Sequence, residues 1–189
     1  MATGGYIVLG IIVVLILWIV LTYNRLISLK NQVLNGWKQI DVQLKRRHDL
    51  IPNLVSTVKG AMDFERGTLE KVMEARAKAM GAKGVAESAQ REGELSQVLG
   101  KFFAVMENYP QLRSNENISQ LQEELTSTEN RIGFARQFYN DIATKFNIAQ
   151  QVFPSSIIAG MSGFQAAELF EIQAAAEREV PKVDLSMKQ

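Results

Sequence analysis

Few residues of this chain belong to types that carry out chemistry. The sequence has one histidine, His48 in the stretch KRRHDL, and no cysteine. These counts exclude a thiol nucleophile, a zinc ribbon and a disulfide framework. They also exclude a multi-histidine metal site. Because cations surround His48 in the sequence, we expect it to lie on the surface of a helical bundle.

Three carboxylates, Glu123, Glu124 and Glu129, have a spacing that could suggest a carboxylate-bridged di-iron bundle. Such a centre needs Glu-x-x-His pairs on two helices, and one histidine cannot supply both. We therefore expect these glutamates on a solvated helix face. Phosphate-binding glycine motifs and the Gly-x-Ser-x-Gly elbow are also missing from the sequence. We predict a protein that is not an enzyme, with no catalytic residue, cofactor site or metal site.

Charge is unevenly distributed along the chain. The 21 Lys and Arg residues balance 20 Asp and Glu residues, and the pI near 7.9 argues against a nucleic-acid-binding protein. Residues 1–23 carry no charged side chain. Within them, the apolar run over 6–23 would cover about 27 Å as a helix, close to the thickness of the hydrocarbon core of a bilayer. We predict a transmembrane helix over 6–23 after a short extracytoplasmic N-terminus, 1–5.

Residues suited to membrane anchoring lie at both ends of this span. Tyr6, Trp18 and Tyr23 are the predicted interfacial aromatics, and Arg25 and Lys30 are the predicted headgroup contacts. Since cations follow the span and none precedes it, the positive-inside tendency places the N-terminus outside and the large domain in the cytoplasm. The alternatives are a cleaved signal peptide and a buried core helix. The run is too long for a signal peptide, and no small-residue cleavage site follows it.

The rest of the chain has helical periodicity. Apolar residues over 26–44 recur at steps of three and four, so we expect the membrane helix to continue as a stalk. Pro52 predicts a kink or a restart, after which the pattern continues to Met80. The first connection is then expected at 81–84, where two glycines occur.

Three further helices follow in this interpretation. The second is predicted over 85–107, and the third starts after Asn117 as its N-cap. The last is predicted over 157–179. The fold class is therefore all-α, with an antiparallel long-helix bundle of about four helices over 24–180 and a C-terminal tail over 181–189.

The third helix has the most regular apolar pattern in the chain. Sustained heptads of this kind predict a seam in a bundle or coiled coil, on which two or more helices pack. The predicted seam and assembly residues are Ile118, Leu121, Leu125, Ile132, Tyr139, Ile142 and Phe146. A dense apolar set follows that includes Phe153, Phe164 and Phe170. It is either the closing core of the bundle or an interface with another subunit, a partner or the membrane.

Lys45, Arg46 and Arg47 form a basic run beyond the reach of the membrane surface. By helical rise they begin about 33 Å from the end of the span, which is several Debye lengths. We therefore predict that they pair with acidic groups of the protein or of another subunit.

Three long blocks of the sequence resemble the LemA family of bacterial membrane proteins. They are YNRLISLKNQVLNGWKQIDVQLKRRHDLIPNLVSTVKG, NENISQLQEELTSTENRIGFARQFYNDIATKFN and FPSSIIAGMSGF, in that order. The resemblance implies one N-terminal helix in the bacterial cytoplasmic (inner) membrane and a cytoplasmic helical bundle. It implies no enzymatic activity, because no catalytic residues are established for the family. Gene neighbourhoods shared with membrane proteases imply a role in the cell envelope.

These observations predict a membrane-anchored helical scaffold that self-assembles as a homo-oligomer. The alternative is an adaptor that recruits or regulates a membrane protease or a cell-wall enzyme. The expected partners are the lipid bilayer, further copies of the chain and a membrane protease or other envelope protein, but no nucleic acid. The mass of the intact membrane complex distinguishes self-assembly from adaptor behaviour.

Overall fold

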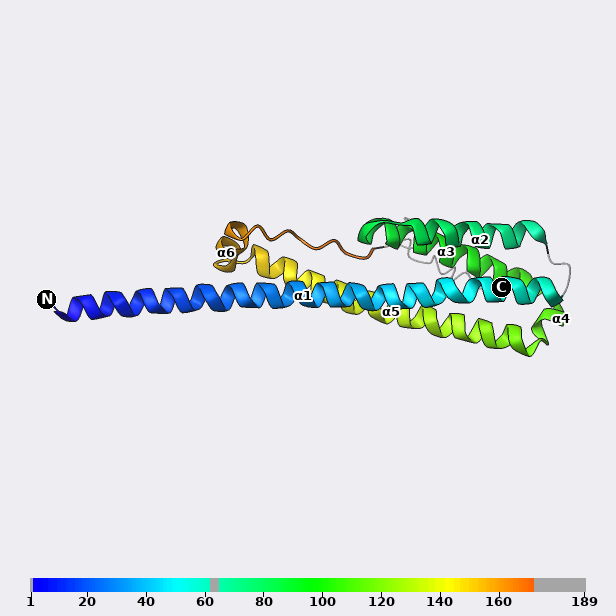
Figure 1. The fold of residues 1–189 in the computed structure, drawn as a ribbon, viewed down its shortest axis with the longest axis horizontal. Helices are drawn as coiled ribbons and strands as arrows, with labels where there is room; N and C mark the ends of the chain where they lie inside the picture. The colour runs from blue at the N-terminus through cyan, green and yellow to red at the C-terminus, as the bar shows by residue number, and fades with distance from the viewer. Residues whose placement is uncertain (1, 62–64, 172–189) are drawn as a thin grey trace, which may run out of the picture.

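The computed structural model describes residues 2–61 and 65–171, and within them the regular structure is entirely helical. This confirms the all-α fold class. Four long helices and two short ones follow one another: α1 (Ala2–Ala61), α2 (Arg66–Gly81), α3 (Gly84–Met106), α4 (Pro110–Arg113), α5 (Glu116–Gln151) and α6 (Ser155–Met161). The long helices run antiparallel beside one another, and the N-terminal part of α1 projects beyond the rest (Figure 1).

The first helix joins the predicted span to the bundle without a break. α1 has 60 residues, which corresponds to about 90 Å of helical rise. A restart at Pro52 does not occur, because the backbone stays helical on both sides of it. Its neighbours Ile51 and Leu54 are fully buried in the core. Their burial offsets the cost of about 3 kcal/mol that an interior proline imposes on a helix.

The first reversal of the chain comes earlier than its sequence predicts. α1 ends at Ala61 and α2 begins at Arg66, so the pattern up to Met80 belongs to two helices. Gly60 and Gly67 border the break and weaken helical structure there. The reversal lets Leu69 and Val72 pack against the distal half of α1, where both are buried. The predicted connection at 81–84 is the second one, and its Gly84 has a φ of +78° that favours glycine.

The start of α5 also differs from the prediction by two residues. The Oδ1 atom of Asn115 accepts hydrogen bonds from the backbone N–H groups of Asn117 and Ile118, at 3.1 and 3.3 Å. Asn115 is therefore the N-cap, and Asn117 lies inside the first turn. The helix predicted over 85–107 agrees closely with α3, which spans Gly84–Met106.

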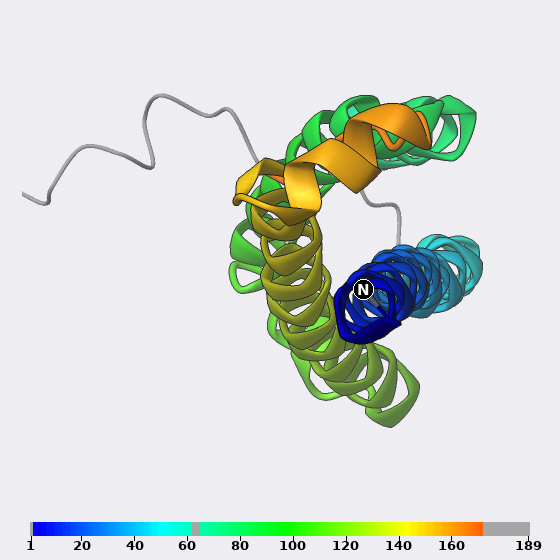
Figure 2. The same cartoon turned by 90° about the vertical axis from the view of Figure 1, so that its left-hand side faces the viewer.

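The predicted seam of α5 is buried inside this chain. Ile132, Tyr139 and Phe146 pack with Val33 and Ile40 of α1 in a membrane-proximal core. Ile118 and Leu125 belong to a distal core shared with α2 and α3. Viewed from the N-terminal end, α1 and α5 lie side by side and α2 and α3 lie together beside this pair (Figure 2).

The prediction of a C-terminal helix over 157–179 is wrong for most of the described residues. α6 ends at Met161, Gly163 has a φ of +67°, and residues 164–171 have no helical structure. The remainder of that predicted helix and the predicted tail over 181–189 lie outside the described residues.

Candidate functional site

A charged cluster joins three helices at the centre of the bundle. Arg47 of α1 forms ion pairs with Glu92 of α3 and Glu129 of α5. Its guanidinium also donates hydrogen bonds to Ser96 Oγ, at 2.9 Å, and to the backbone carbonyl of Glu92, at 3.2 Å. Ser96 Oγ in turn donates to Glu129 at 3.1 Å. The Arg47 and Glu92 side chains are each only 1% exposed.

His48 belongs to this cluster and does not lie on the surface as its sequence context predicts. It is buried, and its Nε2 atom lies 2.8 Å from Glu92 Oε1. The reason is the helical register, which turns His48 toward α3 while its neighbours Lys45 and Arg46 stay exposed. Arg76 of α2 donates a hydrogen bond to the backbone carbonyl of His48 at 2.6 Å. The cluster therefore makes contact with all four long helices.

The cluster suits a structural role better than acid–base chemistry. Burial alone would raise the pKa of Glu92, but the His48 hydrogen bond and the charges of Arg47 and His48 outweigh it and lower this pKa. Glu92 is thus an ionised carboxylate whose oxygens are already engaged. Residues 2–61 and 65–171 contain no group of His, Asp and Glu side chains arranged to hold a metal ion.

Two members of the basic run, Arg46 and Arg47, pair within the chain, as the distance of the run from the membrane predicts. Besides the Arg47 pairs, Arg46 lies 3.7 Å from Glu124, with both side chains partly exposed. Glu129 was expected on a solvated face; its side chain is 42% exposed but one oxygen pairs with buried Arg47. Glu92 was missed in the sequence. The sequence does contain a signal for Glu92, because it belongs to a stripe of residues that recur at steps of one, three and four on the buried face of α3. The other residues of this stripe include Ser88, Ala89, Leu95 and Leu99.

The predicted seam residues leave little of their surface for another chain. Leu121 is half-buried, and the other six are buried. Because these contacts are internal, contact with a second copy must use a different surface.

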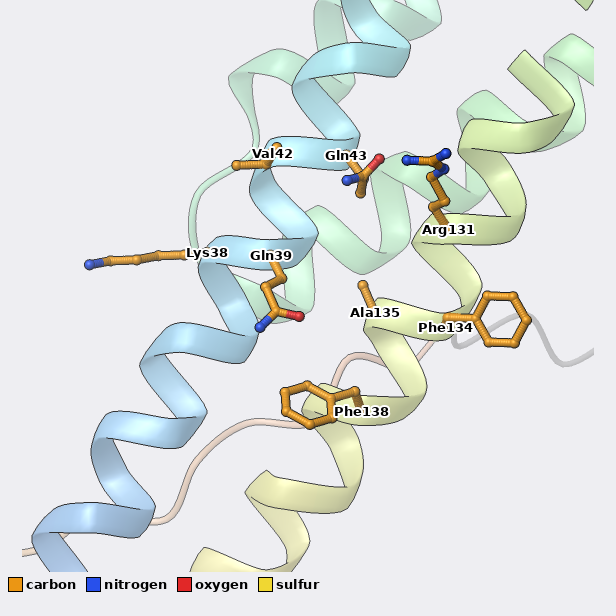
Figure 3. A pocket seen from close by; sticks show the side chains of 8 residues that line it. All are labelled: Lys38, Gln39, Val42, Gln43, Arg131, Phe134, Ala135 and Phe138. Atoms are coloured by element: carbon orange, nitrogen blue, oxygen red, sulfur yellow. The ribbon is translucent and has the colours of Figure 1, made fainter. Parts of the chain in front are cut away.

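An exposed groove between α1 and α5 is a candidate for such a surface. Its lining residues are Lys38, Gln39, Val42 and Gln43 of α1 and Arg131, Phe134, Ala135 and Phe138 of α5. Phe138 lies between the two helices, whereas Phe134 points away from α1 (Figure 3). The exposed fractions are 74% for Phe134, 45% for Phe138 and 62% for Val42. We call this surface the α1–α5 groove.

The predicted anchoring residues lie in the N-terminal half of α1. Tyr6 and Tyr23 are exposed, as are Arg25 and Lys30. Trp18 is half-buried because it packs on a small cluster formed with α6. Among the described helices, only α1 contains a segment apolar and long enough to cross a membrane, and that segment is not buried.

The three phenylalanines of the C-terminal apolar set have different environments. Phe170 is buried, with its ring 6.1 Å from Trp37 and 4.8 Å from the Arg136 guanidinium. Phe164 is half-buried beside Tyr23. Phe153 is 81% exposed. Thus the set is neither all core nor all interface.

Two asparagines hold the segment over 163–170, here called the C-terminal strap, against α5. Asn147 accepts a hydrogen bond from the Ala167 N–H at 2.7 Å and donates to the Ala167 carbonyl at 2.9 Å. Asn140 makes the same pair of bonds with Phe170, at 2.8 and 3.2 Å. Tyr139 adds a bond from its hydroxyl to the Glu168 carbonyl at 2.7 Å.

This strap was missed in the sequence, although it has a signal. Asn140 and Asn147 are seven residues apart, so they lie on one face of α5, each next to a buried seam residue. Burial raises the pKa of Tyr139, and the charge of Glu168 adds to this effect. The hydroxyl therefore remains protonated and able to donate at neutral pH.

The fold and the anchor define a single-pass membrane protein with a helical rod that continues directly from its span. A model of the LemA family matches residues 36–185, and the chain belongs to this family. The predicted resemblance is thus confirmed.

The curated relatives are bacterial proteins. The chain is 24% identical to Protein LemA of Metamycoplasma hominis, over 86% of this chain and 72% of that protein. It is 23% identical to Magnetosome protein MamQ 2 of Paramagnetospirillum magneticum, over 88% of this chain and 71% of that protein. Magnetosome protein MamQ of Magnetospirillum gryphiswaldense is 21% identical over the same shares. The chain is a membrane-associated bacterial protein.

Proposed function

We propose that this protein is a non-enzymatic scaffold of the bacterial cytoplasmic membrane that self-assembles through its helical rod. The observation that carries the proposal is the α1–α5 groove, where Phe134 and Val42 expose most of their side-chain surface. Large exposed apolar side chains in and beside a groove are typical of contact surfaces.

Membrane anchoring favours contact between copies at this groove. By helical rise, Lys38 lies about 22 Å beyond Tyr23. Copies inserted in the same orientation present their grooves at the same height above one membrane. Confinement to the membrane also raises their effective concentration, so that a modest apolar surface suffices. We propose the orientation given by the flanking cations, with the rod in the cytoplasm.

The test is the mass of the complex extracted in a mild detergent, measured by native mass spectrometry. The wild type is expected at a multiple of the 21.1 kDa chain, and the variant Phe134→Ser/Phe138→Ser at the mass of one chain. Met80→Ser is the matched control, because Met80 is 55% exposed on α2 and lies outside the groove. A wild-type protein of one chain in both detergent and lipid nanodiscs would refute self-assembly.

One feature of the groove favours the adaptor function as a second candidate. Lys38 and Arg131 both line it, and a two-fold contact of the groove with itself would bring like charges together. An acidic foreign partner, such as a membrane protease or a cell-wall enzyme, would satisfy them. A stoichiometric foreign protein in the extracted complex, with a single copy of this chain, would support the adaptor.

A further inference from the structure

The turn between α5 and α6 lies beside the membrane-spanning part of α1. Phe153, Pro154 and Ser155 share a cleft with Trp18 and Thr22. In α6, Ile158 and Ala159 are buried in a cluster that also contains Leu26 of α1. The end of the bundle is therefore packed on the last turns of the predicted span.

The turn and the helix α6 also expose large apolar side chains. Phe153, Ile157 and Met161 are 81%, 52% and 83% exposed, and they follow one another at steps of four. This spacing places Ile157 and Met161 on one helix face, away from buried Ile158. Exposed apolar area of this kind is unfavourable in water, at about 25 cal/mol per Å².

The charge pattern sets this segment apart from the rest of the bundle. Residues 146–167 contain no Asp, Glu, Lys or Arg. Lys145 precedes it and Glu168 follows it in the chain, and Lys145 and Arg25 both line the cleft beside the span. An uncharged apolar surface with cations beside it is the composition that binds the boundary between lipid headgroups and acyl chains.

The height of the segment agrees with that boundary. Trp18 lies five residues before Tyr23, so its Cα is about 7 Å inside the predicted end of the span. Interfacial helices bury their apolar face about 5–10 Å into the same region. A surface packed on Trp18 is thus continuous with the membrane-embedded surface of α1.

We propose that the α5–α6 turn and the outer face of α6 insert into the bilayer interface, giving the protein a second membrane contact beside its span. Phe153, Ile157 and Met161 are the inserted residues. Two contacts at one membrane surface fix the rotation of the rod about its axis, which a single span leaves free. This proposal does not depend on self-assembly.

The test uses the full chain, which has no native cysteine. Single variants Phe153→Cys, Ile157→Cys and Met161→Cys are labelled with an environment-sensitive fluorophore and placed in vesicles of equimolar phosphatidylcholine and phosphatidylglycerol. Met80→Cys is the control for an exposed apolar site distant from the span. We expect blue-shifted emission at the three sites, most of it removed by a lipid-attached quencher placed just below the headgroups, and no such effect at Met80→Cys.

Two results would overturn the proposal. Quenching by aqueous iodide as strong as at Met80→Cys, with no effect of the lipid quencher, would place the segment in water. Shielding from both quenchers would place it under protein. Far-UV circular dichroism of each labelled variant verifies that the helical content is retained, and Ile157→Cys provides an independent reading if either neighbouring variant fails to fold.

Discussion

Arg47 of α1 and Glu92 of α3 form an ion pair in which each side chain is 1% exposed. His48 and Ser96 form further hydrogen bonds with the pair. A buried charge without its partner costs far more than an exposed one, because water cannot replace the lost interaction. This pair therefore makes the packing of α1 on α3 sensitive to single substitutions.

The variant Glu92→Gln is expected to lower the free energy of unfolding by about 3 kcal/mol, because it leaves Arg47 with one charged partner instead of two. Denaturant unfolding followed by circular dichroism measures the change. The control is Glu94→Gln, whose partner Arg91 lies 3.1 Å away in a partly exposed pair. That variant should lose less than about 1 kcal/mol. Equal losses in both variants would contradict a special role of the buried pair.

Stability should also fall in acid through the same residue. The pKa of Glu92 is lower in the folded protein than its ordinary value of 4.5. The stabilisation is therefore present above pH 4.5 and is lost as the pH falls through the folded-state pKa. The free energy of unfolding is measured for the wild type and for Glu92→Gln from neutral pH downward. The difference between the two proteins should shrink in that pH range. A constant difference between the two proteins at all pH values would refute this linkage.

The fold class and the α5 seam could be predicted because both depend on local periodicity. Ile132, Tyr139 and Phe146 follow the helical repeat, and burial follows from it. The reversal after Ala61 could not be predicted, since the apolar pattern continues across it. That reversal decides which helices pack against each face of α1. The pairing of His48 on α1 with Glu92 on α3 could therefore not be predicted either.

The last helix was predicted wrongly because local propensity competes with tertiary contacts. The sequence after Gly163 is rich in Ala and Glu, which favour helix. Instead, Asn140 and Asn147 satisfy the backbone groups of Phe170 and Ala167 directly. The side chains of α5 thus replace the helical hydrogen bonds of the strap, which lies 20 residues or more further along the chain. A single sequence does not show contacts between segments so far apart.

The strap depends on Asn147, which makes two hydrogen bonds to one residue. Asn147→Ala should remove about 2 kcal/mol of local stability, so that the Ala167 amide exchanges roughly thirtyfold faster. If the strap opens as a unit, the Phe170 amide, which is bonded to Asn140, should also exchange faster. Hydrogen exchange with mass spectrometry measures both. Asn130→Ala, an exposed asparagine on the same helix, should leave both rates unchanged.

Phe170 and Phe153 provide a direct comparison of core and surface. Phe170→Ala should weaken strap docking by about 3 kcal/mol, because the ring is 3% exposed against Trp37. Phe153→Ala should change stability by less than about 0.5 kcal/mol, since its ring is 81% exposed. Cleavage after Glu168 by a glutamate-specific protease reports strap release. Faster cleavage in Phe153→Ala than in Phe170→Ala would contradict the packing described.

The orientation in the membrane can be tested without a background signal, since the chain has no cysteine. The variants Gly4→Cys and Asn31→Cys place one thiol on each side of the span, at exposed positions. A membrane-impermeant maleimide added to intact spheroplasts should label Gly4→Cys only, because cations follow the span and should stay in the cytoplasm. Asn31→Cys should become labelled after lysis. Labelling of Asn31→Cys in intact spheroplasts would reverse the orientation and place the rod, with its groove and strap, outside the cytoplasmic membrane.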